Sequence, residues 1–365
     1  MIRRICILIA ALAAASTASG LDLSLQIGDF DTHSELLGGA VPTMVEIGGV
    51  YTGISLLPEN RTAVGFLVGG AYYSRDVWKD EDGLEKTVPP DVLTIWTGRW
   101  EVIFSQGFLR REKTGKDFLT LYGGLAGRVE VYPDTGSIDY ITLFDSPESG
   151  GIWSNALKTG VILDATDYDG IIPRGVIAEL EFHHAPKWLL NDIYGKSSYS
   201  LLSTSVTGYL PLFVSRADSG RNTFAVYLAN RVRGDLFLHF DSDVPLFAQD
   251  SPSLGSKMRG LERFAMAGSF TAVNNFDIRV SGPEVFADRL YPRMSLFLDV
   301  GYSDGKNANA AAADAQQMYV SAGAEAGISF FDFLNAGYRA AWMLYNSNKM
   351  EKSFVHGVYM SLQFK

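Results

Sequence analysis

The sequence predicts an all-β protein, a transmembrane antiparallel β-barrel of about 16 strands, with 14 as the alternative. Two observations lead to this prediction. From residue 44 onward, segments of about ten residues alternate apolar and polar side chains and are separated by turns. The chain also begins with a stretch that has the three parts of a secretory signal. Its composition, with 47% hydrophobic residues, 37 glycines and 12% aromatic residues, suits many strands.

The first 20 residues are expected to be a signal peptide. Arg3 and Arg4 precede an apolar run, and small residues follow up to Gly20. The run is too short for a membrane-spanning helix, which needs about 20 apolar residues. The single cysteine, Cys6, lies inside this signal, so the mature chain is expected to lack thiol chemistry and disulfides. Residues 21–40 are expected to form a short N-terminal arm, and residues 41–365 the barrel.

The alternating segments follow one another along the chain. On the segment 291–304, for example, Leu296 and Leu298 share one face and Asp299 lies on the other. A soluble sandwich alternates too, with its apolar face inside. The signal, the number of similar segments and aromatic residues near segment ends favour an apolar face turned to lipid. The predicted strands are 44–56, 62–74, 92–105, 117–131, 137–145, 155–165, 173–187, 197–211, 222–234, 268–281, 291–304, 316–329, 332–345 and 352–365.

The end of the chain and one long interruption stand out. Leu362 and Phe364 alternate to the C-terminus and resemble the closing strand of bacterial outer-membrane barrels, although Lys365 follows the aromatic residue. The longest interruption spans about 235–267. Long loops in compact proteins are usually functional, and this one contains the stretch Lys-Met-Arg-Gly-Leu-Glu-Arg-Phe at 257–264.

Four short motifs, in this order, resemble those of one family. From about Leu157 onward the chain is similar to the superfamily of outer-membrane protein-assembly and two-partner-secretion transporters, also called the bacterial surface antigen family. Each motif alone is a weak signal, and the resemblance to the family depends on the order and spacing of all four. The motif residues are Asp164, Asp167, Pro173 and Gly175 in a strand-turn segment; Met258, Arg259, Gly260 and Leu261 in the long loop; Asp277 and Arg279 in the next strand; and Phe297, Asp299 and Gly301 in the strand after it.

The resemblance implies that the long loop folds back into the lumen, where Arg259 pairs with Asp277 and Asp299 on the barrel wall. A guanidinium offers a planar fork of donors, and unpaired charges in a confined space are costly. Gly260 would let the backbone approach the wall closely. The alternative is that Arg259 is a solvated charge on an external loop.

The resemblance also implies a role in insertion, translocation or surface anchoring of polypeptides. Members of the family usually carry periplasmic polypeptide-transport-associated domains before the barrel, and we expect none here, so the activity is less defined than the architecture. The alternative function is a passive, porin-like pore for small solutes. Its motivation is a set of inward charges of both signs: Arg99, Glu101, Arg128, Glu130, Arg231, Arg233 and Arg339.

Other classes of function find little support. Adjacent His183 and His184 point to opposite faces of a strand, and no known catalytic motif appears, so we expect no enzyme, cofactor or metal site. A net charge of −10 and a pI near 5.0 argue against nucleic acid. The expected partners are outer-membrane lipid, and polypeptide clients or a separate periplasmic protein. The expected location is the outer membrane.

Overall fold

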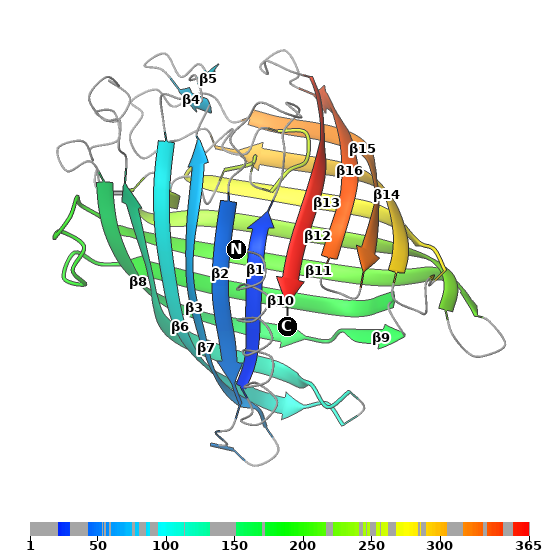
Figure 1. Ribbon diagram of the computed structural model, residues 1–365, viewed down its shortest axis with the longest axis horizontal. Coiled ribbons are helices and arrows are strands. Elements are labelled where there is room, and N and C mark those ends of the chain that lie inside the picture. The colour runs from blue at the N-terminus through cyan, green and yellow to red at the C-terminus, as the bar shows by residue number, and fades with distance from the viewer. Residues whose placement is uncertain are drawn as a thin grey trace, which may run out of the picture.

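In the computed structural model, antiparallel strands close into a barrel (Figure 1). The structure describes residues 21–29, 43–52, 54, 56–57, 60–74, 77–79, 85–87, 94–112, 114–131, 151–169, 172–216, 222–240, 244–245, 247–248, 253–255, 257–261, 268–283, 285, 290–304, 317–330, 334–345 and 353–364.

Fourteen strands of the described chain form the ring. Each pairs with its neighbour in the sequence, and β17 returns to pair with β1. A short strand, β9 (Asp167–Asp169), is added to β10, and β4 (Val77–Lys79) pairs with β5 (Glu85–Thr87) outside the ring. The ring strands are β1 (Leu21–Asp29), β2 (Thr43–Tyr51), β3 (Thr62–Ser74), β6 (Thr94–Arg110), β7 (Asp117–Val131), β8 (Gly151–Asp164), β10 (Ile172–Ala185), β11 (Tyr199–Arg216), β12 (Asn222–Phe240), β13 (Phe270–Ser281), β14 (Leu290–Ser303), β15 (Gln317–Phe330), β16 (Leu334–Tyr345) and β17 (Phe354–Phe364).

The seam between the first and last strands is short. β1 and β17 share a register of four residue pairs, from Leu25↔Phe364 to Asp29↔Ser361, with a shift after Ile27. By contrast, β11 and β12 pair from Tyr199↔Phe240 to Arg216↔Asn222. The closure of the barrel therefore depends on its shortest described ladder, where β1 and β17 stand side by side in Figure 1.

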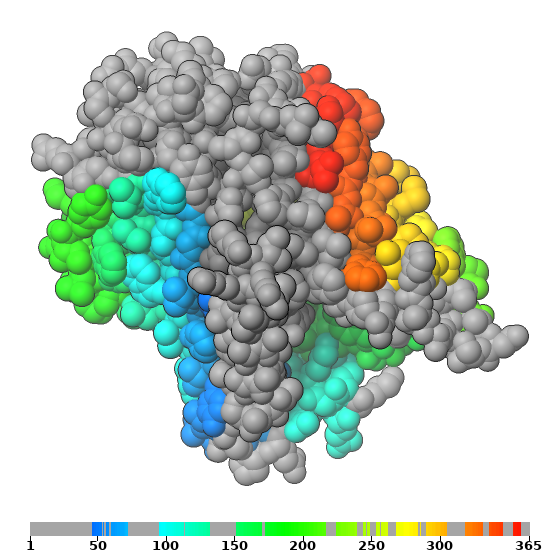
Figure 2. Space-filling view, viewed as in Figure 1, coloured from blue at the N-terminus to red at the C-terminus, as the bar shows by residue number. Residues whose placement is uncertain are grey.

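The two faces of the wall have opposite character. On β14, Leu296 and Leu298 are 62% and 42% exposed, whereas the alternate residues Phe297 and Asp299 are buried. A water-soluble sheet would bury the apolar face instead, so this pattern is that of a transmembrane barrel. Figure 2 shows part of the outer surface, with early strands in blue and cyan and late strands in orange and red. Other exposed apolar side chains include Val102, Leu121, Leu180, Val206, Val232, Ile278, Trp342 and Leu344.

The structure corrects three expectations: the number of strands, the extent of the N-terminal arm and the bounds of the long loop. The ring has 14 strands, which is the alternative count, so the main prediction of about 16 is wrong for the described chain. Residues 21–29, expected in an N-terminal arm, form β1, because their short alternation finds a partner on each side. β12 continues to Phe240, and its buried Asp235 and Phe237 alternate with the exposed Leu236 and Leu238. The loop therefore spans 241–269 instead of 235–267.

Some expectations lie outside the described residues. These are the signal at 1–20, the rest of the arm at 30–40 and the strand at 137–145. Within the described ranges, no helix has the length and apolar character needed to cross a membrane.

Candidate functional site

The candidate site is the contact between residues 253–261 of the β12–β13 loop and the polar face of strands β12 to β16. Three loop side chains, Leu254, Met258 and Leu261, are buried here. They pack against one residue each of β13, β15 and β16, namely Val273, Tyr319 and Met343. Burying an aliphatic side chain stabilises a contact by roughly 1.5–3 kcal/mol, so an apolar cluster anchors the loop to an otherwise polar wall.

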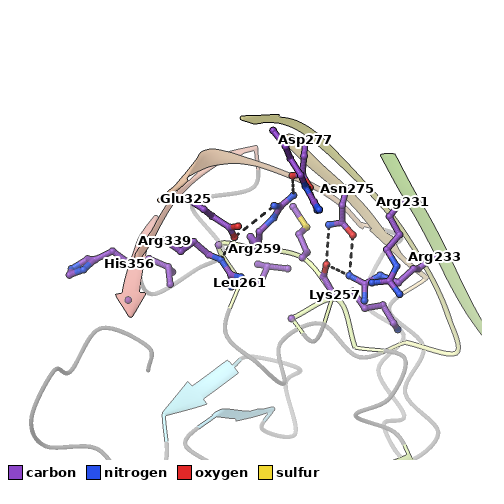
Figure 3. A pocket seen from close by; sticks show the side chains of 16 residues that line it. Arg231, Arg233, Lys257, Arg259, Leu261, Asn275, Asp277, Glu325, Arg339 and His356 are labelled. Atoms are coloured by element: carbon purple, nitrogen blue, oxygen red, sulfur yellow. Dashed lines mark hydrogen bonds and ion pairs between the residues drawn. The ribbon is translucent and has the colours of Figure 1, made fainter. Parts of the chain in front are cut away.

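Arg259 is held by the carboxylates of two neighbouring strands, Asp277 of β13 and Asp299 of β14. Figure 3 shows the contact with Asp277. The Nε and Nη2 of Arg259 donate to Oδ2 and Oδ1 of Asp299 at 2.9 and 2.6 Å, and its backbone N–H donates to Oδ2 at 2.8 Å. Nη2 also lies 2.7 Å from Oδ1 of Asp277, as an ion pair without hydrogen-bond alignment. Cζ stands 3.9 Å from the centre of the Phe297 ring, a cation–π distance. The structure thus brings together the loop Arg and the two acids named from the sequence.

The charges at this contact are nearly all removed from solvent. Asp299 is fully buried, and the Arg259 and Asp277 side chains are 13% and 5% exposed. Burial alone would lower the pKa of the Arg259 guanidinium, but the hydrogen bonds and charge of Asp299, with Asp277, outweigh burial and raise its pKa. Arg259 therefore stays charged, and the removal of Arg259 would leave the buried charge of Asp299 without compensation.

Two glycines let the loop and wall approach each other. Gly260 has a φ of +93°, which side chains with a Cβ rarely adopt, and a Cβ there would lie 3.1 Å from Ser321 Cβ and 3.2 Å from Ala341 Cβ. On the wall, a Cβ at Gly301 would lie 2.8 Å from Met258 Sδ. Phe297, Asp299 and Gly301, which alternate along β14, therefore all face the loop.

Lys257 fixes the loop at a second point. Its carbonyl accepts hydrogen bonds from Arg233 Nη2 at 2.8 Å and Asn275 Nδ2 at 3.0 Å. Its ammonium pairs with Asp235 of β12. Burial lowers the pKa of the Lys257 ammonium, and Asp235 offsets part of this effect. These contacts tie the loop to β12 and β13, in addition to the β14 contact of Arg259.

The first described part of the loop packs elsewhere. Val244 and Ala248 are buried and Phe247 packs beside them, while the Arg128 guanidinium lies 4.7 Å from the centre of the Phe247 ring. Their wall partners are Ala156, Ala185, Tyr199, Leu201 and Phe237, from β8 and β10 to β12. Together the two parts of the loop contact eight consecutive ring strands, β8 and β10 to β16, and both parts contact β12. Arg128 adds a contact from β7.

The strand-turn motif forms a separate small hairpin. Asp164 Oδ1 accepts from the Thr166 backbone N–H at 2.8 Å, and Arg174 Nη2 donates to Asp167 Oδ2 at 2.6 Å. Pro173 pairs with Tyr168 of β9, and Gly175 has a φ of +96°. This motif shapes the hairpin. The backbones of Leu362 and Phe364 pair with Ile27 and Leu25 in the β1–β17 seam.

Several site residues were not anticipated. Glu325 of β15 lies 3.8 Å from Arg259 Nη1 and also binds Arg339 of β16. Ser321 donates its hydroxyl to the Arg259 carbonyl. Alternation along β15 places Ser321 and Glu325 on the same face of the strand as Tyr319, because residues 319, 321, 323 and 325 share a face. Arg279, named as part of a motif, pairs with Asp277 through Nε and Nη2.

Two cavities lie beside the loop. One, of about 340 Å³, is lined by the loop itself and β12, β13, β15, β16 and β17; the other, of about 410 Å³, is lined by Phe247, Ala248 and strands β3 to β11 of the opposite wall. In the second, Glu181 binds Lys158 at 3.0 Å and His183 at 2.6 Å, and accepts from the Tyr122 hydroxyl at 2.7 Å. These side chains satisfy one another as a polar network. The described residues contain no cluster of three potential metal-binding side chains.

The fold and the bound loop together define a class, the transmembrane β-barrels whose polar face holds a loop. Comparison with solved structures is more specific, since the fold is that of the BamA and CdiB barrels. BamA from Haemophilus ducreyi lacking POTRA domains 1–3 matches with a TM-score of 0.53 at 12% identity, over 95% of this chain and 70% of that one. CdiB from Acinetobacter baumannii matches with a TM-score of 0.51 at 13% identity, over 95% of this chain and 60% of that one. CdiB from Escherichia coli matches with a TM-score of 0.53 at 12% identity, over 94% of this chain and 63% of that one.

These neighbours are bacterial outer-membrane barrels, and the likeness to them concerns the fold. The chain spans 60 to 70% of their lengths. No family model matches the sequence, and no curated protein matches it.

Proposed function

We propose that this protein is an outer-membrane barrel of the assembly and secretion type, which takes part in the insertion, translocation or surface anchoring of polypeptides. The observation that carries this proposal is the engagement of Arg259 by Asp299 and Asp277. The opposite face of the same strands is apolar and exposed, which supports a lumen-side position for the face that holds the loop. The loop 241–269 then acts as a plug inside the barrel.

The short β1–β17 seam supports a role in handling polypeptides. A strand that pairs over four residues exchanges partners more readily than one paired along its whole length, because fewer backbone hydrogen bonds must break. Opening of this ladder would expose a strand edge, and an exposed edge is a template for pairing with another chain. A client strand could thus be bound at the seam.

A disulfide across the seam tests this role. Gln26 and Gln363 are register partners, and directly opposite residues have a Cα separation of about 4.5–5.5 Å, within disulfide range. The Gln26→Cys, Gln363→Cys variant, oxidised in liposomes, should fail to accelerate the folding of an unfolded model barrel, and reduction should restore the rate. A control lock between β1 and β2, Ser24→Cys with Gly48→Cys, should leave the rate unchanged. An oxidised seam lock with full activity would reject the proposal.

The passive pore is the second candidate, since cavities remain on two sides of the loop. Planar-bilayer conductance separates the two functions. A plugged barrel should show small, flickering conductance that grows when residues 245–263 are deleted. A large, steady open state in the intact protein would favour the pore. Copurification of a periplasmic protein or an exported client would identify the partner of the first candidate.

A further inference from the structure

The 340 Å³ cavity is unusually rich in cations (Figure 3). Among the described residues, its lining includes six cations, Arg231, Arg233, Lys257, Arg259, Arg279 and Arg339, and two carboxylates, Asp277 and Glu325. Two further acids, Asp235 and Asp299, reach these cations from the wall. Even with these counted, the cations outnumber the acids, although the chain as a whole carries a net charge of −10.

The pairing pattern shows where the excess charge lies. Arg259 pairs with Asp299 and Asp277, Lys257 with Asp235, Arg279 with Asp277, and Arg339 with Glu325. Arg233 donates to neutral acceptors, the Lys257 carbonyl and Asn275 Oδ1. Arg231 is exposed and lines the cavity, and within the described part of the chain its side chain has neither a hydrogen bond nor an ion pair. Among the described residues, the uncompensated positive charge is therefore on Arg231 and Arg233 of β12.

The second cavity lacks this excess. There Lys158 pairs with Glu101 and Glu181, and His183 with Glu181. Arg128 and Arg99 on the same wall pair with Glu130 and Glu46. Of these two cavities, as far as their described linings go, positive charge without a counter-charge is a property of the one beside β12.

We propose that this cavity binds a small oxyanion ligand, bearing phosphate or carboxylate groups, with Arg231 as its main contact. Arg231 and Arg233 are two residues apart and project to the same face of β12. A guanidinium fork matches the paired oxygens of such a group. Arg279 and Arg339, 41% and 30% exposed, offer further donors at the cavity. A volume of about 340 Å³ is suited to a small organic molecule.

Anion binding here goes beyond the proposed transport role and does not require it. Because Arg233 also holds the Lys257 carbonyl, a bound anion would neutralise repulsion next to the point where the loop meets β12. A ligand that binds only the docked loop stabilises that state by mass action. The site would therefore couple anion concentration to loop docking.

The test is calorimetric titration of the purified full chain in zwitterionic detergent at constant ionic strength. Pyrophosphate and a tetra-aspartate peptide are separate probes, which distinguish a phosphate ligand from a peptide carboxylate. Arg231→Gln should weaken binding of the preferred probe at least about tenfold, as expected for a charged hydrogen-bonded contact. Arg231→Lys, which keeps the charge and loses the fork, should fall between. Arg293→Gln removes an exposed charge of β14 that is not part of the lining and should bind like the wild type.

Heat-modifiable electrophoretic mobility will show that each variant is folded. If Arg231→Gln does not fold, the wild-type protein still decides the matter, since pyrophosphate or the peptide should raise its Tm at constant ionic strength whereas chloride should not. Absence of binding by either probe at millimolar concentration would overturn the proposal. Equal binding by the wild type and Arg231→Gln, or equal losses in Arg231→Gln and Arg293→Gln, would overturn it as well.

Discussion

The pairing of Arg259 with Asp299 can be measured by a double-mutant cycle. Arg259→Ala leaves Asp299 fully buried without its partner, and the removal of one member of a buried pair costs about 3–5 kcal/mol. Asp299→Ala should cost less, about 2–3 kcal/mol, because Arg259 keeps Asp277 and Glu325. The double variant loses both charges, and Asp277 keeps Arg279. We therefore expect a coupling energy of about 2 kcal/mol.

The free energy of unfolding is measured by urea titration in detergent micelles, followed by tryptophan fluorescence. Arg293→Ala combined with Asp299→Ala is the control, because Arg293 lies near the end of β14 and is exposed, and its effect should simply add. Additivity of Arg259→Ala and Asp299→Ala within about 0.5 kcal/mol would refute the contact.

Three further variants test the β12–β13 loop, the exposed apolar face, and the loop 186–198 between β10 and β11. Gly260→Ala should destabilise the protein by about 1–2 kcal/mol, because φ there is +93° and the wall lies close, whereas Gly208→Ala in an uncrowded position should have little effect on the same urea titration. Leu298→Arg places a charge on the exposed apolar face and should lower the unfolding free energy in lipid vesicles by up to about 2–4 kcal/mol; no loss there would contradict a lipid-facing surface. Asn191→Ala removes a buried side-chain amide whose Oδ1 accepts from the Asn155 backbone N–H at 2.6 Å. Hydrogen exchange of the Asn155 backbone amide should therefore accelerate. An unchanged exchange rate would show that the 186–198 loop does not depend on Asn191.

Some features of the protein follow from the local sequence pattern, and others depend on contacts between distant segments. Alternation along β14 identified Asp299 as facing away from Leu298, because the pleat of a strand imposes a period of two whatever its neighbours are. The order of short motifs then led to Arg259, Asp277 and Asp299 as one group, and the structure places these three side chains in contact.

The sequence by itself thus determined the class of fold and the two faces of each strand, since both depend on short-range pattern. Only the tertiary structure decided the strand number and the role of β1, because closure requires β1 to meet β17 more than 300 residues away in the chain. It also decided which side chains anchor the loop. Met258 and Leu261 are parts of a sequence motif, yet their burial against Tyr319 and Met343 depends on the folding of β15 and β16 beside them.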